Sequence, residues 1–382
     1  ALSSAAAEPR RFVSAAAQAR VDALGRAAVE GRIPLNGSLA MTHRCQLRCV
    51  HCYLGDERHA SSEAGELPTT FWLDLLDQLA EAGCLNLLVT GGEPLLRPDF
   101  ATVYEHAIRR GLLTTVFTNA TLVDERIEAL FTDWPPQLVE VSLYGASAPV
   151  YEQVTGTAGS FSRCLRGIEA LLAAGVAVGL KAMILRDNQD EVAAMREIAR
   201  ARGLRFRVDP AVTPRLSGDP APLQQRVPAG EAVALEMADQ ALLERAAELA
   251  EKNRDRPDEE RLYSCMAGVT SFHVDPRGTL LPCLTVSDGG YDLRSGRFAE
   301  GWGGVLARFP EQGIEPGYEC HRCERRVLCG VCPAGFALET GSPHRKSDYN
   351  CALGDARFRA IAERGEPGGR GAEDTNRNEP RE

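Results

Sequence analysis

Long apolar runs are missing from this sequence of 382 residues, since no stretch comes near the 18 uninterrupted apolar residues typical of a membrane-spanning helix. The first residues are rich in alanine and arginine but include no apolar segment of the secretory type. Positive charge is also scarce, because 53 acidic residues against 43 basic ones give a net charge of −10. We therefore expect no membrane partner and no nucleic-acid partner, which would need a clustered basic face.

The rest of the composition is that of an ordinary globular protein, with 44% hydrophobic and 25% charged residues. Such a chain can bury a full core, which excludes a disordered chain, a collagen-like chain and a small disulfide scaffold. Its length predicts two or three domains.

Twelve cysteines are distributed unevenly along the chain. Three of them lie between residues 45 and 52, and four lie between residues 320 and 332. Disulfide frameworks serve small secreted domains, whereas tight cysteine clusters in a large chain are typical of thiolate ligands for metal. We therefore expect a reducing compartment, the cytoplasm.

Short apolar runs alternate with helical patterns from Leu35 to Asp209. The expected strands are residues 38–42, 85–90, 114–118, 138–143, 177–185 and 205–209, and the clearest helical patterns are 70–82, 100–110 and 160–174. Six β–α alternations predict an α/β fold with a parallel sheet, either open or closed into an incomplete barrel. Chemistry in such folds lies at the carboxyl ends of the strands.

The chain divides into five expected segments. Residues 1–34 should form a helical extension, 35–228 the α/β core and 229–261 a linker helix. Residues 262–362 are short on periodicity and heavy in Cys, Gly and Pro, so we expect them to need metal to form a core. Residues 363–382 have almost no apolar side chain and should be disordered.

The first cysteine group is a CxxxCxxC motif formed by Cys45, Cys49 and Cys52, on the loop after the first expected strand. Three thiolates at this spacing can hold three irons of a [4Fe–4S] cluster and leave the fourth iron open to another ligand. The alternative is a zinc site, whose fourth ligand could be His43 or His51.

The segment Thr90-Gly91-Gly92-Glu93-Pro94 closes the second expected strand. Paired glycines let a backbone come close to a ligand, and the Glu93 carboxylate can accept from an ammonium group. Taken alone, the segment could equally be a plain turn from strand to helix. Beside the three-cysteine loop it offers an amino-acid-shaped site next to an open iron.

These motifs resemble those of the radical S-adenosylmethionine (SAM) superfamily, whose members carry CxxxCxφC after the first strand and a GGE-type motif after the second. His51 stands where an aromatic residue is usual, and its planar ring can take the place of that aromatic side chain. The resemblance implies a partial (β/α)6 barrel in which SAM chelates the open iron. It also implies that Gly91, Gly92 and Glu93 hold the methionine part of SAM.

Polar residues on later strands are further candidates by the same resemblance. Asn119 and Ser142 resemble the family's ribose and amino-acid contacts, although Asn119 could be a turn residue bonded to its own backbone. Similar enzymes use a lysine at the position of Lys181 to meet a substrate or SAM carboxylate; the alternative is an exposed position near the strand mouth. Together with Lys181, the candidates for catalysis are Arg207 and Asp209, which could instead form an ion pair with each other.

The remaining cysteines follow a second spacing, which resembles the SPASM domain of radical SAM peptide-modifying enzymes. One interval departs from that pattern, because two residues rather than three separate Cys329 from Cys332. The resemblance implies three [4Fe–4S] clusters, one that binds SAM and two auxiliary ones. One auxiliary cluster would be held by Cys320, Cys323, Cys329 and Cys351, and the other by Cys265, Cys283 and Cys332. Two structural zinc ribbons are the alternative, and Cys84 and Cys164 are expected to be buried structural thiols.

The resemblance implies a radical SAM oxidoreductase that cleaves SAM reductively to a 5′-deoxyadenosyl radical and abstracts hydrogen from a substrate. The expected substrate is a ribosomally made peptide that gains a crosslink, a thioether or an oxidised residue. A separate leader-binding protein and an external low-potential electron donor of the flavodoxin or ferredoxin type are the expected partners. Sulfatase-maturating relatives have an aspartate after the second SPASM cysteine, whereas Leu284 follows Cys283 here, which argues against formylglycine formation.

The sequence leaves two other functions open. The first is radical SAM oxidation or decarboxylation of a tetrapyrrole or another small molecule. The second is a non-catalytic iron–sulfur protein used for electron transfer or as a scaffold, which would leave the segment from Gly91 to Glu93 without a role.

Overall fold

The computed structural model describes residues 15–57, 65–254, 257–258 and 260–365. Its centre is a nine-stranded sheet with the order β6-β5-β4-β3-β2-β1-β7-β8-β9. Strands β1 to β7 run parallel to one another, and β8 and β9 continue the sheet as antiparallel strands. The strands are β1 Asn36–Ala40, β2 Asn86–Thr90, β3 Leu113–Thr118, β4 Leu138–Ser142, β5 Val178–Met183, β6 Arg205–Asp209, β7 Ser271–Val274, β8 Thr279–Leu281 and β9 Tyr291–Asp292.

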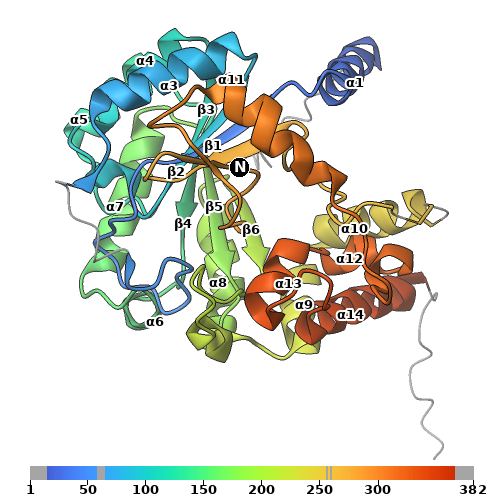
Figure 1. Cartoon of the computed structure of the whole chain (residues 1–382). Coiled ribbons are helices and arrows are strands. Elements are labelled where there is room, and N and C mark those ends of the chain that lie inside the picture. The colour runs from blue at the N-terminus through green and yellow to red at the C-terminus, as the bar shows by residue number, and fades with distance from the viewer. Residues whose placement is uncertain (1–14, 58–64, 255–256, 259, 366–382) are drawn as a thin grey trace, which may run out of the picture.

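Helices alternate with the first six strands, as Figure 1 shows. The six expected strands and the parallel α/β arrangement are confirmed, and β6 begins and ends at the predicted residues. These helices are α3 Thr69–Glu81, α4 Phe100–Arg109, α5 Glu125–Asp133, α6 Ala148–Thr155, α7 Ser160–Ala173 and α8 Val192–Arg200.

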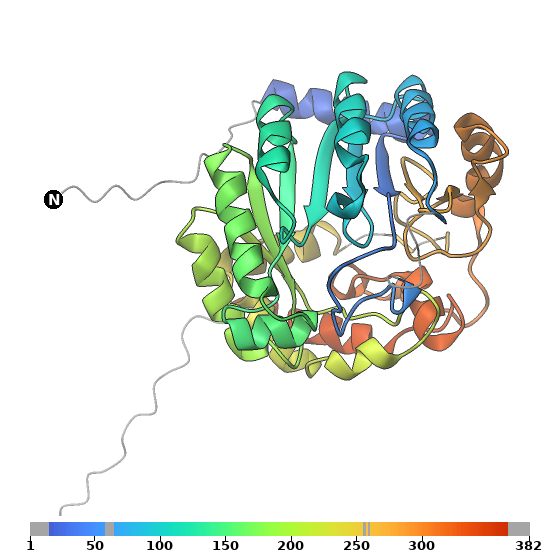
Figure 2. The ribbon, with the colours of Figure 1, turned by 90° about the vertical axis from the view of Figure 1, so that its left-hand side faces the viewer.

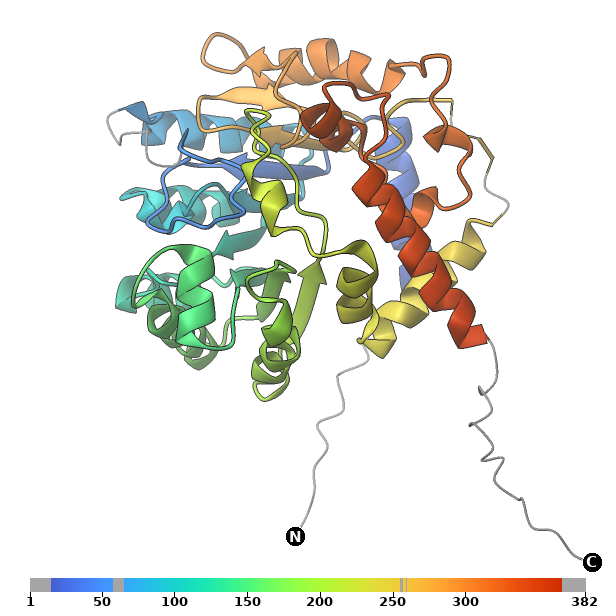
Figure 3. The same cartoon turned by 90° about the horizontal axis from the view of Figure 1, so that it is seen from below.

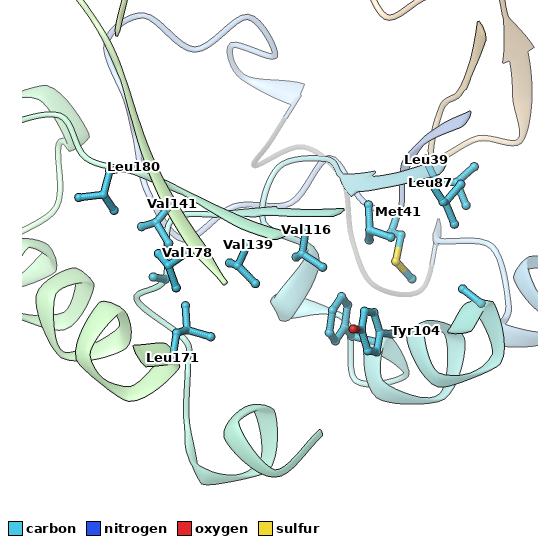
Figure 4. Packing of buried hydrophobic residues seen from close by; sticks show 14 of the residues in the cluster. Leu39, Met41, Leu87, Tyr104, Val116, Val139, Val141, Leu171, Val178 and Leu180 are labelled. Carbon is cyan, nitrogen blue, oxygen red and sulfur yellow. The ribbon is translucent and has the colours of Figure 1, made fainter. Parts of the chain in front are cut away.

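The main core lies between the helices and one face of the sheet. Val116, Val139 and Val141 are fully buried there, and Figure 4 shows them on the same side as Leu171 of α7 and Tyr104 of α4. Successive side chains of a strand point to opposite faces, so the residues between these valines point to the inner face. The inner face is where the polar candidates of β4 to β6 lie.

The C-terminal region continues this sheet, although no strand was expected within residues 262–362. β7 pairs with β1 from Asn36↔Ser271 to Leu39↔Val274. Phe272, Leu280 and Phe298 belong to the main core. The signal was missed because β7 and β8 are only four and three residues long, too short for their periodicity to be recognised.

The predicted linker helix is two helices, and both contact the C-terminal helix α14 (Figure 3). Arg357 of α14 donates to both carboxylate oxygens of Glu236 of α9, at 2.8 and 2.9 Å. The helices of this region are α9 Ala229–Met237, α10 Gln240–Lys252, α11 Phe298–Glu300, α12 Arg326–Cys329, α13 Pro333–Thr340 and α14 Asp348–Gly365. Helices α9 and α10 therefore pack against the C-terminal region instead of only leading to it.

The two ends of the chain are described in part. Helix α1 spans Ala15–Glu30 of the predicted helical extension, and residues 1–14 lie outside the described residues. Helix α14 continues to Gly365, so the predicted tail does not begin at residue 363, and residues 366–382 lie outside the described part. Of the helices described, none is both long enough and apolar enough to span a bilayer.

Candidate active site

A cavity of about 780 Å³ lies at the carboxyl ends of the parallel strands. The loop after β1 and the C-terminal helices, red in Figure 2, lie at this same end of the strands. Inner-face side chains form much of the wall, and Cys283 and Leu284 after β8 also line the cavity. The predicted site residues that line the cavity are Cys45, Cys49, His51, Cys52, Gly91, Gly92, Asn119, Ser142, Lys181, Arg207, Asp209 and Cys283.

The loop that holds Cys45, Cys49 and Cys52 has no regular secondary structure and is fixed by backbone hydrogen bonds to helix α6. The amide of Arg48 donates to the carbonyl of Thr155 at 2.7 Å, and the amide of Val50 donates to the carbonyl of Val154 at 3.0 Å. All three thiols line one cavity as a result.

The paired glycines pack against the start of this loop. A Cβ on Gly91 would collide with the carbonyl oxygen of Thr42, and one on Gly92 would collide with the carbonyl oxygens of His43 and Arg44. Gly91 also has a φ of 140°, which side chains other than glycine rarely adopt. The amide of Gly92 donates to Thr42 O at 2.7 Å. The glycines therefore make room for the backbone at the start of the cysteine loop, in addition to the predicted room for a ligand.

Glu93 does not line the cavity, contrary to its expected place beside a bound ligand. Its side chain is fully buried and accepts hydrogen bonds from Thr118 Oγ1 and the amide of Asn119, both at 2.8 Å, and from the amide of Leu95 at 3.2 Å. Burial raises the pKa of Glu93 to about 7, although these three donors oppose the shift. Glu93 therefore joins the end of β2 to the end of β3 and acts as a positioning residue.

Asn119 and His51 tie the cysteine loop to the neighbouring strand ends. The Asn119 Oδ1 accepts from Gln46 Nε2 at 2.9 Å, and its Nδ2 lies 3.9 Å from the sulfur of Cys45. Asn119 also accepts from the amide of Thr121 at 3.0 Å, so the alternative of a turn residue is part of its role. The His51 ring packs edge-on against Tyr144 with 4.5 Å between centroids. His51 thus makes the ring contact that an aromatic residue would make here.

Charged side chains gather on the inner face of β4, β5 and β6. Ser142 and Lys181 are register partners, as are Lys181 and Arg207. Arg207 pairs with Glu140 at 2.9 Å rather than with Asp209. Only 20% of the Lys181 side chain is exposed, so the alternative of an exposed lysine is wrong.

Two further residues of this region were not among the predicted site residues. Glu140 is a buried carboxylate on the inner face of β4, and His273 of β7 lines the cavity and lies 3.1 Å from Ser38 Oγ. Burial lowers the pKa of His273 to about 4. Each has an apolar residue on either side within a short strand, Leu138–Ser142 or Ser271–Val274, and a charged or imidazole side chain at such a position was the available signal.

Two of the C-terminal cysteines, Cys332 and Cys329, have as neighbours other thiols of the group to which the resemblance assigns them. Burial raises the pKa of Cys332, and the nearby thiols of Cys283 and Cys265 raise it further. Burial likewise raises the pKa of Cys329 to about 12, with added effects from its neighbours Cys351, Cys323 and Cys320. Across the described ranges, no three His, Cys, Asp or Glu side chains are placed to hold a single metal ion.

Cys84 and Cys164 stay outside both groups. Each is buried, with exposures of 7% and 0%, and burial raises the pKa of each thiol to about 12. The prediction that they are buried is confirmed.

The sequence profile of the radical SAM superfamily matches residues 39–199, which include the cysteine loop and strands β2 to β5. The chain belongs to the radical SAM superfamily. It is a radical SAM enzyme of the oxidoreductase type with a SPASM-type C-terminal domain, and its cofactors include SAM and a [4Fe–4S] cluster. The predicted fold class, a partial radical SAM barrel followed by a cysteine-rich SPASM domain, is confirmed.

Relatives of this radical SAM enzyme differ in how much of the chain they cover. A PqqA peptide cyclase of Granulibacter bethesdensis is 28% identical over 359 residues, which cover 87% of this chain and 92% of that protein. An AdoMet-dependent heme synthase of Methanosarcina barkeri is 33% identical over 166 residues, which cover 43% of this chain and 46% of that protein. The crystal structure of Streptococcus suis SuiB bound to S-adenosylmethionine has the same fold, with a TM-score of 0.66 at 16% identity over 88% of this chain and 79% of SuiB.

Proposed function

We propose that this enzyme is a peptide maturase that binds SAM at the loop of Cys45, Cys49 and Cys52 and abstracts hydrogen from a peptide held in the cavity. The three thiolates would hold three irons of a [4Fe–4S] cluster and leave the fourth for SAM. One observation carries the proposal: this loop and the SPASM cysteine Cys283 line a single cavity.

The residues around the loop suit a bound SAM. Gly91 and Gly92 line the cavity, and their backbone would contact the methionine part, while the backbone of residues 42–44 occupies the space that their side chains would take. Ser142 lies at the end of β4 and would meet a ribose hydroxyl, and His51 and Asn119 would complete the site. Glu93 would not contact SAM itself and would instead hold the backbone amide of Asn119 in place.

When bound, the cluster and SAM supply a 5′-deoxyadenosyl radical by one-electron cleavage of a carbon–sulfur bond. The chain's own part is to orient SAM, to hold one C–H bond of the peptide within reach and to exclude water from the cavity. Leu284 lines the cavity but has no group that can accept a proton, so formylglycine formation is not part of the proposal.

The C-terminal cysteines suit two auxiliary clusters. Cys320, Cys323, Cys329 and Cys351 would hold one cluster, and Cys265, Cys283 and Cys332 would hold the other. The mutual proximity of the thiols within each group supports this division. Because Cys283 lines the cavity, the second cluster would stand beside the substrate, where an electron left on the product could be accepted.

A peptide is favoured over a tetrapyrrole by the extent of the two resemblances. The peptide cyclase relative matches 87% of this chain, which must include much of the SPASM-type domain, whereas the heme synthase matches 43%. A tetrapyrrole remains the second candidate because the identity over that shorter match is the higher one, 33% against 28%. A leader-binding protein, a low-potential donor of the flavodoxin or ferredoxin type and a cytoplasmic location belong to the same proposal.

The test uses the full chain, reconstituted with iron and sulfide without oxygen and reduced with dithionite. We expect 5′-deoxyadenosine to form from added SAM, and a co-expressed candidate peptide to change in mass. Cys84→Ala is the matched control, because it removes a cysteine that lies outside both groups and the cavity. Absence of 5′-deoxyadenosine would refute the enzyme activity, and consumption of a tetrapyrrole with no peptide modified would favour the second candidate.

A further inference from the structure

The cavity reaches the seam between β1 and β7, whose polar side chains the proposed function does not use. Ser38 of β1 and both Ser271 and His273 of β7 line the cavity. Ser38 and His273 are register partners, and Ser271 stands two residues before His273, so the three side chains lie on one face of the sheet. Leu39 and Phe272, which alternate with them, belong to the main core on the other face.

His273 is buried in this seam with one of its two ring nitrogens satisfied. The residue is only 2% exposed, and its Nδ1 lies 3.1 Å from Ser38 Oγ, within hydrogen-bond distance. In the part of the chain that the structure describes, its Nε2 has no hydrogen-bond partner. A buried polar atom costs free energy unless it is paired, so Nε2 requires a partner that enters from the cavity.

The seam carries no charge at neutral pH. Burial lowers the pKa of His273 to about 4, and His43 lowers it further, so the ring is neutral. One nitrogen of a neutral imidazole donates and the other accepts, and each serine hydroxyl can do both. The seam is therefore an uncharged hydrogen-bonding surface, in contrast to the cavity wall at β5 and β6, which carries Lys181 and Arg207.

A primary amide matches this surface better than the other polar side-chain groups do. Its oxygen accepts while its NH2 group donates twice, so that it can bond to the imidazole and to a hydroxyl at the same time. A hydroxyl has a single hydrogen to donate. A carboxylate has no donor and would lose its hydration without gaining an opposite charge, and an apolar side chain would leave Nε2 unpaired.

The seam lies near both cysteine regions of the proposed reaction. Strand β1 leads into the loop of Cys45, and Cys283 stands two residues after Leu281, the register partner of His273. Two residues of extended chain span at most about 7 Å. A substrate group bound at the seam would therefore lie close to Cys283, and the residues next to it in the substrate would reach toward the carboxyl ends of the strands.

We propose that Ser38, Ser271 and His273 bind the side-chain amide of an asparagine or glutamine in the substrate peptide. This inference depends on the proposed function for the peptide nature of the substrate. The amide would bond to Nε2 of His273 and to the hydroxyls beside it. An amide anchored at β1 and β7 would determine which neighbouring residue of the peptide faces SAM.

The experiment compares three pentapeptides of the form Ala-Ala-X-Ala-Ala, in which X is glutamine, glutamate or methionine. Each carries an acetyl cap and an N-methylamide cap, so that the glutamine side chain is the only primary amide present. Saturation-transfer NMR is recorded on the anaerobically reconstituted protein with SAM bound. The glutamine peptide should bind about tenfold more tightly than either of the others, the difference expected when a buried hydrogen-bonding group loses its partner.

Variants of the seam should change this preference in a graded way. His273→Phe and Ser38→Ala should each remove most of it, and His273→Gln should restore part of it because an amide can also donate and accept. Thr115→Val is the matched control. Thr115 pairs with Leu88, which pairs with Ser38, so it lies in the same row of the sheet, but it does not line the cavity.

Melting temperatures check that the variants fold, and Ser271→Ala gives a second test if His273→Phe does not. Equal affinity of the three peptides for the unaltered protein, or no binding of any of them, would overturn the proposal and leave water as the partner of Nε2. Tighter binding of the glutamate peptide, or a glutamine preference that persists in the seam variants, would overturn it too. Failure of SAM cleavage with the glutamine preference intact would count against the proposed function instead.

Discussion

The two cysteine regions of this enzyme bring their thiols together in different ways. Cys45, Cys49 and Cys52 share one loop, and backbone hydrogen bonds from that loop to the end of α6 fix its path. Cys329 and Cys351 belong to different helices, α12 and α14, and they come near each other because these two helices pack together. The first site depends on local spacing, whereas the second depends on tertiary structure.

The hydrophobic cores next to the two cysteine regions differ in whether they contain proposed ligands. The buried cysteines of the main core are Cys84 and Cys164, neither of which is a proposed ligand. The smaller C-terminal core contains Cys320 and packs against Cys283 and Cys332. Ligand removal should therefore leave the barrel folded but loosen the C-terminal region, because a small core gains much of its stability from bound metal.

Replacing a cysteine of the first loop should have the largest effect on activity. We expect Cys49→Ala to abolish 5′-deoxyadenosine formation, because two thiolates cannot hold the cluster to which SAM binds. The iron bound by the C-terminal cysteines should remain, as iron analysis of the reconstituted variant would show. Loss of all iron would mean that the two cysteine regions depend on each other for iron binding, contrary to the difference described between them.

Replacing a cysteine of the second region should change stability as well as iron content. Cys329→Ser removes a buried thiol from the group of Cys320, Cys323 and Cys351. Hydrogen exchange of the reconstituted protein should then show faster exchange in α12 and α14, with the barrel strands unchanged. Equal loss of protection in β2 to β5 would contradict the idea that only the C-terminal core depends on its ligands.

The pH dependence of Glu93 tests how the first loop is supported. The pKa of Glu93 is raised by burial from 4.5 to about 7, so its contribution to stability is full below pH 4.5 and is lost as pH rises through 7. A shift of this size corresponds to a change on the order of 3 kcal/mol. The melting temperature of the unaltered protein should therefore fall between pH 5 and pH 7.5 by more than that of Glu93→Gln. Parallel changes in the two proteins would show that Glu93 is not the titrating group.

A smaller effect is expected where the glycines meet the cysteine loop. Gly92→Ala places a methyl group against the carbonyl oxygens of His43 and Arg44, which should cost about 1–3 kcal/mol and displace the loop. Gly230→Ala is the matched control, because a Cβ at Gly230 in helix α9 meets no atom within 4 Å. We expect thermal unfolding and SAM cleavage to change in the first variant only. Similar behaviour of the two variants would argue against a steric role for Gly92.

The sequence predicted best those features that depend on residues close together in the chain. Strands β1 to β6 and the three-cysteine loop depend on runs and spacings of a few residues, and these were recognised. The pairing of β7 with β1 was not, because it joins residues far apart in the chain. The same holds for Glu140, whose three cations come from β5 and β6, and for Glu93, whose burial depends on Thr118 and Asn119.

The account requires that the loop of Cys45, Cys49 and Cys52 carries the cluster at which SAM binds. Electron paramagnetic resonance of the reduced, reconstituted protein tests this requirement directly when spectra are compared before and after addition of SAM. We predict that SAM changes the spectrum of one cluster in the unaltered protein and that this change is absent from Cys49→Ala. A spectrum that does not respond to SAM, or a response that persists in Cys49→Ala, would contradict the account.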